Sequence, residues 1–364
     1  MRVGVNLLWC VPGDVGGSEE YLVRQLLGLA DAAPDLAAVT TLFVLPAFTA
    51  AHPDLSSRYP MTVAPFDGVS RRRRVMGEAG WLRGASRGVG LTHHGGGTAP
   101  VAARHPYVVT IHDLQYRTFP QYFHPAKLAY LRVMMRRSGR GAARIAVPTQ
   151  YVRGTVVDAF GVRPERVVVV PHGVEAAVRS TVTPPAVLRQ RYGLGNGPYV
   201  MYPAITHPHK NHRLLVELLA GPWAGRDLRV VCTGGRGAAE DVVAGCADPR
   251  LVRLGRVPDA DRNGLIAAAA ALVFPSTYEG FGAPLIEAMT LGTPIVCSDA
   301  ASLPEVAGDA AVVRPPTVDA WADALDEVER HRADLVPVGY RRAEQFTALR
   351  SGGALAAVYR EVLA

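Results

Sequence analysis

The stretch over residues 271–299 constrains the fold most, because its pattern is that of one strand–helix–strand unit. A short apolar strand comes first and is followed by a polar, glycine-rich turn over 276–282. Pro284 suits the first turn of a helix, where its missing N–H needs no partner, and Gly292 predicts the end of that helix before a second apolar strand. The turn therefore lies at the carboxyl end of a parallel strand, where open α/β sheets bind ligands.

This turn carries two carboxylates, Glu279 and Glu287, on either side of a helix start. Backbone N–H groups at a helix start attract phosphate, because they are unpaired and the helix dipole is positive there. A plainer interpretation is also open. Glu287 would then only complement the dipole of its own first turn, and Glu279 would be a solvated side chain.

Length and composition indicate a globular protein of two domains. The chain has 364 residues, of which 49% are apolar and 20% charged. The net charge of +7 is spread along the sequence and comes with no recognisable nucleic-acid module, so no nucleic-acid partner is expected. Anionic small molecules or a membrane surface fit this charge equally well.

The cysteines and the apolar runs indicate a cytoplasmic protein. The four cysteines form no C-x-x-C pair and are expected as free thiols, mostly buried, in a reducing compartment. No secretory signal is expected, since residues 1–11 lack a small-residue cleavage site. The apolar run over 265–274 is too short to cross a bilayer. Peripheral contact with a membrane remains open.

The first domain is expected to begin with a buried strand over 2–9 and a glycine-rich turn. Gly16 and Gly17 let the backbone approach a ligand at the start of a helix over 19–31, with Ser18 as its N-cap. An ordinary strand-to-helix turn is the alternative. The four arginines over 71–74 predict a solvated face or a patch for an anionic acceptor or membrane.

Histidines next to glycines mark a second candidate region. His93 and His94 precede Gly95 and Gly96, which indicates a ligand-facing loop, since glycine permits close approach. No metal site is expected there, because adjacent histidines project differently. His112 follows a strand over 106–111 and so lies at the carboxyl end of that strand, a position suited to a site.

A basic amphipathic helix is expected over 121–144, and the turn at 171–174 closes the first domain. The segment over 175–197, rich in proline and glycine, is interpreted as a linker. The alternation of strands and helices then begins again with a strand over 198–204. Lys210 follows at a strand-to-helix turn, where a cation and free backbone N–H groups can meet a diphosphate.

Two motifs in this half have rival interpretations. His207, His209 and His212 could form a metal cluster, but Lys210 and Arg213 among them would repel a cation. The Asp-x-Asp string at 259–261 could bind a metal. It is interpreted instead as a helix start, where acidic residues are favourable.

Residues 279–287 read E-G-F-G-A-P-L-I-E, and this string resembles the signature of the retaining nucleotide-sugar glycosyltransferases of family 4. Further matches follow the family's order along most of the chain: the glycine loop, H-D-L at 112–114, the P-H-G turn and P-H-K-N-H at 208–212. Two departures occur. His172 replaces the usual asparagine of the turn, and His209 stands where many members have arginine.

The resemblance implies an α/β fold of the GT-B type, with two Rossmann-like doubly wound domains facing each other across a cleft. The first domain is expected over 1–178, with the last helix, over 346–364, packing back onto it. The second is expected over 186–345, after the linker over 175–197. The fold thus follows from the family, while strand and helix positions follow from the residues themselves.

The resemblance also assigns roles to residues. His112, Glu279 and Lys210 are expected to be catalytic, and His94, Gly95 and Gly96 are expected on the acceptor side. Glu279 should hold hydroxyls of the donor sugar, and Glu287 should hold the ribose. The residues expected to bind the donor are Gly16, Gly17, His209, Lys210, Arg256, Val257, Glu279, Gly280, Phe281, Gly282, Ala283, Pro284, Leu285 and Glu287.

The implied function is transfer of a sugar from a nucleoside diphosphate sugar to an acceptor hydroxyl, with retention and with neither a metal nor another cofactor. A non-hydrolysing epimerase of the same architecture and a sugar-nucleotide-binding protein without turnover are the alternatives. An NAD-dependent enzyme is disfavoured, because no G-x-G-x-x-G follows the first strand. The sequence leaves open which sugar and which base the donor carries, and the oligomeric state. It also leaves open the acceptor, and whether that acceptor is anionic or membrane-associated.

Overall fold

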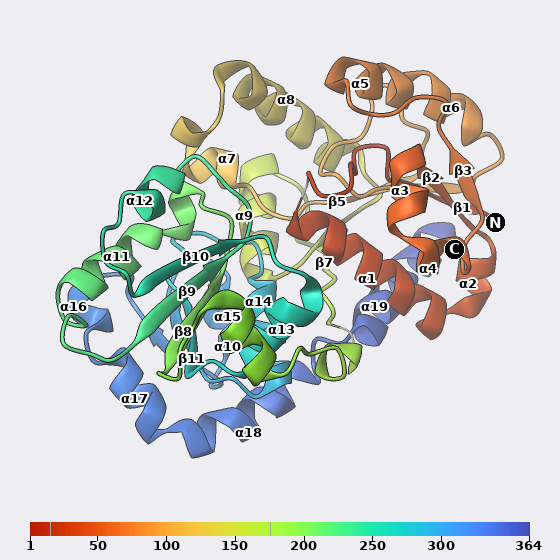
Figure 1. Cartoon of the computed structure of the whole chain (residues 1–364). Coiled ribbons are helices and arrows are strands. Elements are labelled where there is room, and N and C mark those ends of the chain that lie inside the picture. The colour runs from red at the N-terminus through yellow and green to blue at the C-terminus, as the bar shows by residue number, and fades with distance from the viewer. Residues whose placement is uncertain (15, 175) are drawn as a thin grey trace. The chain divides into compact units, whose positions relative to one another are not determined.

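The computed structural model describes residues 1–14, 16–174 and 176–364, without the side chains of residues 71, 72, 176 and 177. The chain divides into two compact units (Figure 1). Unit 1 comprises Met1–Gly173 and Phe346–Ala364, and unit 2 comprises Val174–Gln345. The expected linker over 175–197 contains a short 3₁₀ helix and an α-helix, so much of it is regular structure.

The described residues of unit 1 form a seven-stranded parallel sheet in the order β3-β2-β1-β4-β5-β6-β7. The strand order reverses between β1 and β4, which makes the carboxyl ends of these two strands the topological switch point of the sheet. The strands are β1 (Val3–Asn6), β2 (Thr40–Val44), β3 (Met61–Val63), β4 (Leu91–His94), β5 (Tyr107–Thr110), β6 (Arg144–Val147) and β7 (Val167–Val169).

Helices cover this sheet. They are α1 (Gly17–Ala32), α2 (Pro34–Ala38), α3 (Pro46–Ala51), α4 (Pro53–Ser56), α5 (Arg71–Ala79), α6 (Trp81–Ala85), α7 (Gln115–Thr118), η1 (Pro120–Tyr122), α8 (Pro125–Gly141), α9 (Gln150–Phe160), η2 (Pro164–Arg166) and α19 (Ala348–Leu363). The basic helix expected over 121–144 is α8, which is shorter than expected. It begins at Pro125, after a 3₁₀ turn. The four-arginine run begins α5, and the side chains of Arg71 and Arg72 lie outside the described part.

Helices α1 and α19, from opposite ends of the chain, lie against each other in unit 1 (Figure 1). Gly28 and Gly352 stand at their crossing, where a Cβ on either would overlap the backbone of the other helix. Gln25 Nε2 donates to Ser351 Oγ over 3.3 Å beside this contact. The last helix therefore belongs to the core of the first unit.

Unit 2 has, within its described residues, a six-stranded parallel sheet in the order β10-β9-β8-β11-β12-β13. This is the strand order of the doubly wound nucleotide-binding fold, with its switch point between β8 and β11. The strands are β8 (Tyr199–Pro203), β9 (Arg229–Thr233), β10 (Leu251–Gly255), β11 (Ala271–Phe274), β12 (Ile295–Ser298) and β13 (Val312–Arg314). Most of their residues are buried, as expected for parallel strands covered on both faces.

The helical elements of unit 2 follow the expected alternation with strands. They are η3 (Ala176–Arg179), α10 (Pro185–Tyr192), η4 (Pro208–Lys210), α11 (His212–Ala220), α12 (Glu240–Ala244), α13 (Asp259–Ala267), α14 (Ala283–Leu291), α15 (Leu303–Ala307), α16 (Val318–Trp321), α17 (Ala324–Arg330) and α18 (Arg332–Ala343). The strand–helix–strand unit predicted over residues 271–299 is confirmed as β11, α14 and β12.

The Asp-x-Asp string starts helix α13, which confirms its interpretation as a helix start. Asp261 is buried and accepts hydrogen bonds from Arg191 Nη1 over 2.6 Å and from Tyr192 Oη over 2.5 Å. This carboxylate therefore ties α13 to α10. Of the cysteines, Cys10, Cys232 and Cys297 are buried free thiols, as expected. No helix in the described ranges has the length and apolar character needed to span a membrane.

Candidate functional site

Two loops meet at the switch point of unit 2. The loop after β8 carries Lys210, and the loop after β11 carries Glu279. Lys210 Nζ donates to Glu279 Oε1 over 2.6 Å, and the two side chains are only 19% and 11% exposed. The sheet thus brings together two residues that the sequence assigns to catalysis, although they are 69 positions apart.

Backbone and hydroxyl contacts fix these loops against each other. Thr277 N donates to His209 O over 2.7 Å, and Tyr202 Oη donates to Lys210 O over 2.5 Å. Ser302 Oγ, at the start of α15, donates to Glu279 O over 2.9 Å. These contacts fix the backbone on both sides of the ion pair, so the two side chains are preorganised.

His209 is uncharged in this setting. Burial lowers the pKa of His209 to about 3, and the positive charge of Lys210 and the neighbouring His207 act in the same direction. The rings of His207 and His209 stack with their centroids 5.7 Å apart. A phosphate bound beside His209 would favour protonation of its ring. The ring would therefore be charged only when such a ligand is bound.

Helix α14 presents its N-terminus to the same loop. Its N-cap is Gly282, with φ of 94°, and no side chain of the described residues caps the helix. Ala283 and Pro284 are partly exposed there, with Gly280 just before them. Unlike Ala283 and Pro284, Leu285 has a buried side chain, and its N–H already donates to Gly282 O over 3.0 Å.

Glu287, the residue expected to hold the ribose, is buried in the structure. It is 2% exposed and lies within α14, with Oε1 3.4 Å from Arg262 Nη2 of α13. Phe281 is buried as well. Arg262, whose side chain lies beside the Glu287 carboxylate, is 21% exposed.

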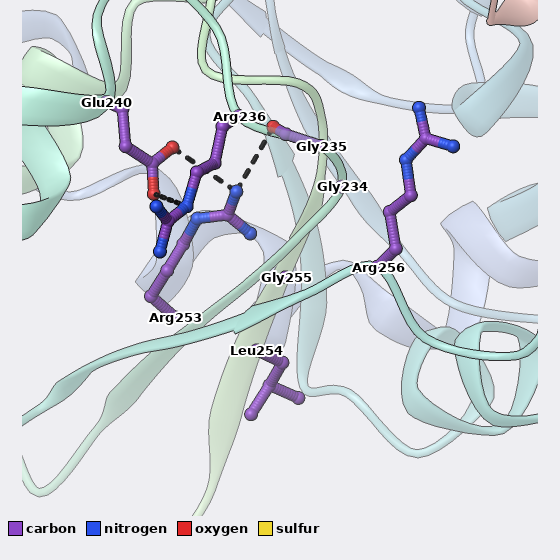
Figure 2. Close-up of a pocket in the computed structure, with 8 residues that line it drawn as sticks. All are labelled: Gly234, Gly235, Arg236, Glu240, Arg253, Leu254, Gly255 and Arg256. Carbon is purple, nitrogen blue, oxygen red and sulfur yellow. Dashed lines mark hydrogen bonds and ion pairs between the residues drawn. The ribbon is translucent and has the colours of Figure 1, made fainter. Parts of the chain in front are cut away.

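A pocket of about 370 Å³ opens at the carboxyl ends of β9 and β10, next to these loops (Figure 2). Arg253 spans its floor, donating from Nη2 to Gly235 O over 3.1 Å and pairing with Glu240 at 3.3 Å. Arg256 extends on the other side of the glycine pair and is exposed. Its neighbour Val257 is half-buried. The pocket is lined by Gly234, Gly235, Arg236, Glu240, Arg253, Leu254, Gly255 and Arg256.

Hydrogen bonds join this pocket to the Lys210 loop. Thr206 N donates to Gly235 O over 3.3 Å, and Gly237 N donates to Thr206 Oγ1 over 2.7 Å. Gly234, with φ of 119°, has no room for a Cβ, which would lie 2.5 Å from Ala204 O. The loops after β8, β9, β10 and β11 therefore make one continuous edge in unit 2.

In unit 1 the glycine loop lies at the corresponding switch point, after β1. Helix α1 begins at Gly17 behind Gly16, whose φ is 61°, so Ser18 lies inside the helix and the prediction of Ser18 as N-cap is wrong. Gly13 N donates to Glu19 Oε2 over 2.9 Å, and this contact folds the loop onto the helix start. Val15 of this loop lies outside the described residues.

His112 follows β5 in unit 1, and its tautomer can be assigned from its contacts. Its Nε2 lies 2.9 Å from Gly95 O, so Nε2 must carry the proton and donate it. Burial lowers the pKa of His112 to about 4, hence the ring is neutral and Nδ1 is an acceptor. That Nδ1 atom is buried and has no hydrogen-bond partner among the described residues. A hydroxyl of a bound ligand would satisfy it.

The expectation of a ligand-facing loop at His93 and His94 is wrong, since both belong to β4 and are buried. His94 Nδ1 accepts from Asn6 Nδ2 over 3.2 Å, and burial lowers the pKa of His94 to about 3. Gly95 and Gly96 do form the loop after β4. An added Cβ on Gly96 would lie 2.5 Å from Trp9 Cγ, so this glycine is needed for packing.

Sequence reasoning missed several residues that build the site. Arg262 and Ser302 carry no motif, and only the folded chain shows that they contact Glu287 and the Glu279 loop. Glu240 and Arg253 were also missed. The one available signal was their position near the carboxyl ends of expected strands.

Family models match both halves of the chain. Residues 15–178 match the model described as Glycosyltransferase Family 4, and residues 197–331 match the model described as Glycosyl transferases group 1.

Among curated relatives, O-antigen chain mannosyltransferase B of Escherichia coli is 34% identical over 58% of this chain and 58% of its own length. The MMP alpha-(1->4)-mannosyltransferase of Mycolicibacterium hassiacum is 28% identical over 64% of this chain and 57% of its own length. The chain thus spans less than two thirds of the length of these relatives.

Solved structures share the fold over the whole chain. Anabaena HepE in complex with UDP and glucose has a TM-score of 0.76 at 20% identity and covers 99% of both chains. Sucrose-phosphate synthase from Thermosynechococcus elongatus has a TM-score of 0.76 at 18% identity, covering 100% of this chain and 99% of its own.

Proposed function

Because the chain belongs to the glycosyltransferases of family 4, with the GT-B fold, we propose that it transfers a sugar from a nucleoside diphosphate sugar to an acceptor hydroxyl. The observation that carries this proposal is the Lys210–Glu279 pair at the switch point of unit 2. It puts a cation and a carboxylate beside an uncapped helix N-terminus, which is the chemistry that a sugar diphosphate requires.

In the proposed reaction the bond between the anomeric carbon and the diphosphate oxygen breaks, and its electron pair leaves with the diphosphate. Lys210 and the amides at the start of α14 stabilise that developing charge. The acceptor oxygen bonds to the anomeric carbon, and its proton passes to the departing diphosphate. The positive charge from Lys210 supports a reaction that proceeds without a divalent cation, and the family resemblance supports retention of configuration.

Other residues would orient the sugar. Glu279 accepts hydrogen bonds from donor hydroxyls when Lys210 turns to the diphosphate, and Glu287 binds the ribose. His112 accepts a hydrogen bond from the reacting sugar through its unpaired Nδ1. The pocket beside Arg256 and Val257 would take the nucleoside, since it adjoins the Lys210 loop.

The names of similar proteins guide the choice of donors for testing. Two relatives are named mannosyltransferases, and a solved neighbour is HepE in complex with UDP-glucose. A thermal-shift panel of uridine, guanosine, adenosine and thymidine diphosphate sugars should identify the donor, because a ligand that binds the folded state raises the melting temperature. That donor should then release nucleoside diphosphate when acceptors are added.

Two readouts test the finer parts of the proposal. The product should have the donor's anomeric configuration by NMR, and a chelator should leave the rate unchanged. Stabilisation by no member of the panel, or consumption of the donor with no acceptor present and an epimer as product, would contradict glycosyl transfer.

A further inference from the structure

A second pocket lies in unit 1. It has a volume of about 310 Å³ and is lined by Arg117 of α7 and by Arg132 and Arg136 of α8. Figure 1 shows α7 close to α8, and contacts between the two helices hold the three side chains around one hollow. This volume is at the lower end of the range for small-molecule sites, about 300–1,000 Å³.

The stretch of sequence that forms this pocket is strongly basic, although Asp113 directly precedes it and Asp158 directly follows it. Residues 114–157 contain no acidic residue and eight basic ones. Several other arginines pair with carboxylates, as the half-buried Arg226 does with Asp326 at 2.5 Å and the exposed Arg360 does with Asp35 at 3.0 Å. None of the three pocket arginines forms an ion pair with a carboxylate in the described ranges, so their charges are not neutralised by the protein.

The three positive charges repel one another without a counter-ion. Arg132 and Arg136 are four positions apart on one helix, where like charges are unfavourable. Arg117 adds a third positive charge from another helix. An anion between the three side chains would convert this repulsion into attraction.

We propose that Arg117, Arg132 and Arg136 form a binding site for a phosphate or diphosphate group, separate from the Lys210 site in unit 2. Guanidinium groups offer paired N–H donors that match phosphate oxygens, and three of them from two helices can surround a tetrahedral group. The group can belong to a lipid headgroup or to a free phosphate compound. This site does not depend on the proposed transferase function.

The binding test uses inorganic diphosphate, titrated calorimetrically in a Lys210→Ala background to remove the other expected diphosphate site. The test variant adds Arg117→Gln, Arg132→Gln and Arg136→Gln. Its matched control adds Arg87→Gln, Arg163→Gln and Arg350→Gln, which removes three exposed charges from the same unit. All six positions are exposed, so both variants should fold, and melting curves check this.

The pocket site predicts that the Lys210→Ala protein binds one diphosphate, that the pocket variant binds it at least tenfold more weakly, and that the control variant stays within twofold. Binding should also weaken steeply as salt is raised. No binding by the Lys210→Ala protein, or equal losses in both triple variants, would overturn the site.

Vesicles distinguish the two sources of phosphate. Co-sedimentation with phosphatidylglycerol vesicles, reduced in the pocket variant and competed by diphosphate, assigns the site to a lipid headgroup. If diphosphate binds as predicted while these vesicles are bound no better than phosphatidylcholine vesicles, the ligand is a free phosphate compound. Transfer assays with the donor are independent of both results.

Discussion

Lys210 and Glu279 form a 2.6 Å ion pair that joins the loops after β8 and β11 of unit 2. This carboxylate neutralises the cation that we propose for the diphosphate. The pair is mostly buried, so its charges are weakly screened, and a bound diphosphate must compete with Glu279 for Lys210. The two residues should therefore affect binding and turnover differently.

Lys210→Ala should lower the rate of sugar transfer at least about tenfold, which corresponds to roughly 1.4 kcal/mol in the barrier. The variant loses the charge that stabilises the departing diphosphate, so kcat should fall with the identified donor. Lys127→Ala is the matched control, because Lys127 is the chain's other lysine and is exposed. Equal rates in wild type and Lys210→Ala would remove Lys210 from the mechanism.

Glu279→Gln should separate product affinity from turnover. Removing a negative charge 2.6 Å from Lys210 leaves the lysine free for phosphate, so the nucleoside diphosphate should bind at least as tightly as in wild type. Transfer should still fall about tenfold or more, since the donor hydroxyls lose their carboxylate acceptor. Calorimetry and initial rates measure the two effects. Weaker product binding together with an unchanged rate would contradict this role.

His112→Gln tests the unpaired ring nitrogen in unit 1. The glutamine amide can still donate to Gly95 O, but it offers no acceptor at the place of Nδ1. We expect kcat/KM to fall at least about tenfold with a small change in melting temperature. Since the pKa of His112 is lowered to about 4, an acidic limb of the pH–rate profile near 6.5 should not arise from this ring. Loss of such a limb in His112→Gln would show that the assigned protonation state is wrong.

Local sequence signals predicted much of unit 2 correctly. The helix after Glu279 follows from Pro284 and Gly292, whose backbone effects are strong and local. The meeting of Lys210 with Glu279 follows from strand order, which came from the family resemblance and not from the residues alone. The partner of Glu287 could not be predicted, because Arg262 lies 25 positions earlier on another helix.

Unit 1 shows where such reasoning fails. His93 and His94 next to glycines have the composition of a loop, yet both extend β4 into the core, where Thr110, Tyr359 and Asn6 supply hydrogen-bond partners. Burial of a polar residue depends on partners distant in sequence, and no local pattern reports them. The Ser18 prediction failed because the helix begins at Gly17, two residues earlier than a Ser18 cap implied.

Adjacent glycines on α19 should respond in opposite ways to alanine. At Gly352 a Cβ would overlap the backbone of Gly28 and Leu29 on α1, so Gly352→Ala should destabilise unit 1 by roughly 1–3 kcal/mol. At Gly353 the nearest atom, Ala32 Cβ, would be 3.8 Å away, so Gly353→Ala should stabilise the helix by about 0.5–1 kcal/mol. Chemical denaturation measures both variants. Equal stabilities would contradict the close crossing of α1 and α19.

Buried neutral histidines should make unit 1 sensitive to acid. Burial lowers the pKa of His93 and of His94 from an ordinary value of 6.5 to about 3. Between these values the unfolded chain binds protons that the folded chain does not, so stability is complete above pH 6.5 and falls as the pH falls. From pH 6.5 to 5 each ring should lower the free energy of unfolding by up to roughly 2 kcal/mol.

His93→Gln should reduce this dependence of stability on pH, which denaturation at pH 7 and pH 5 measures. His124→Asn, at an exposed position where asparagine can still cap α8, should leave it unchanged. The same pH dependence in both variants would mean that His93 is not the buried neutral group described above.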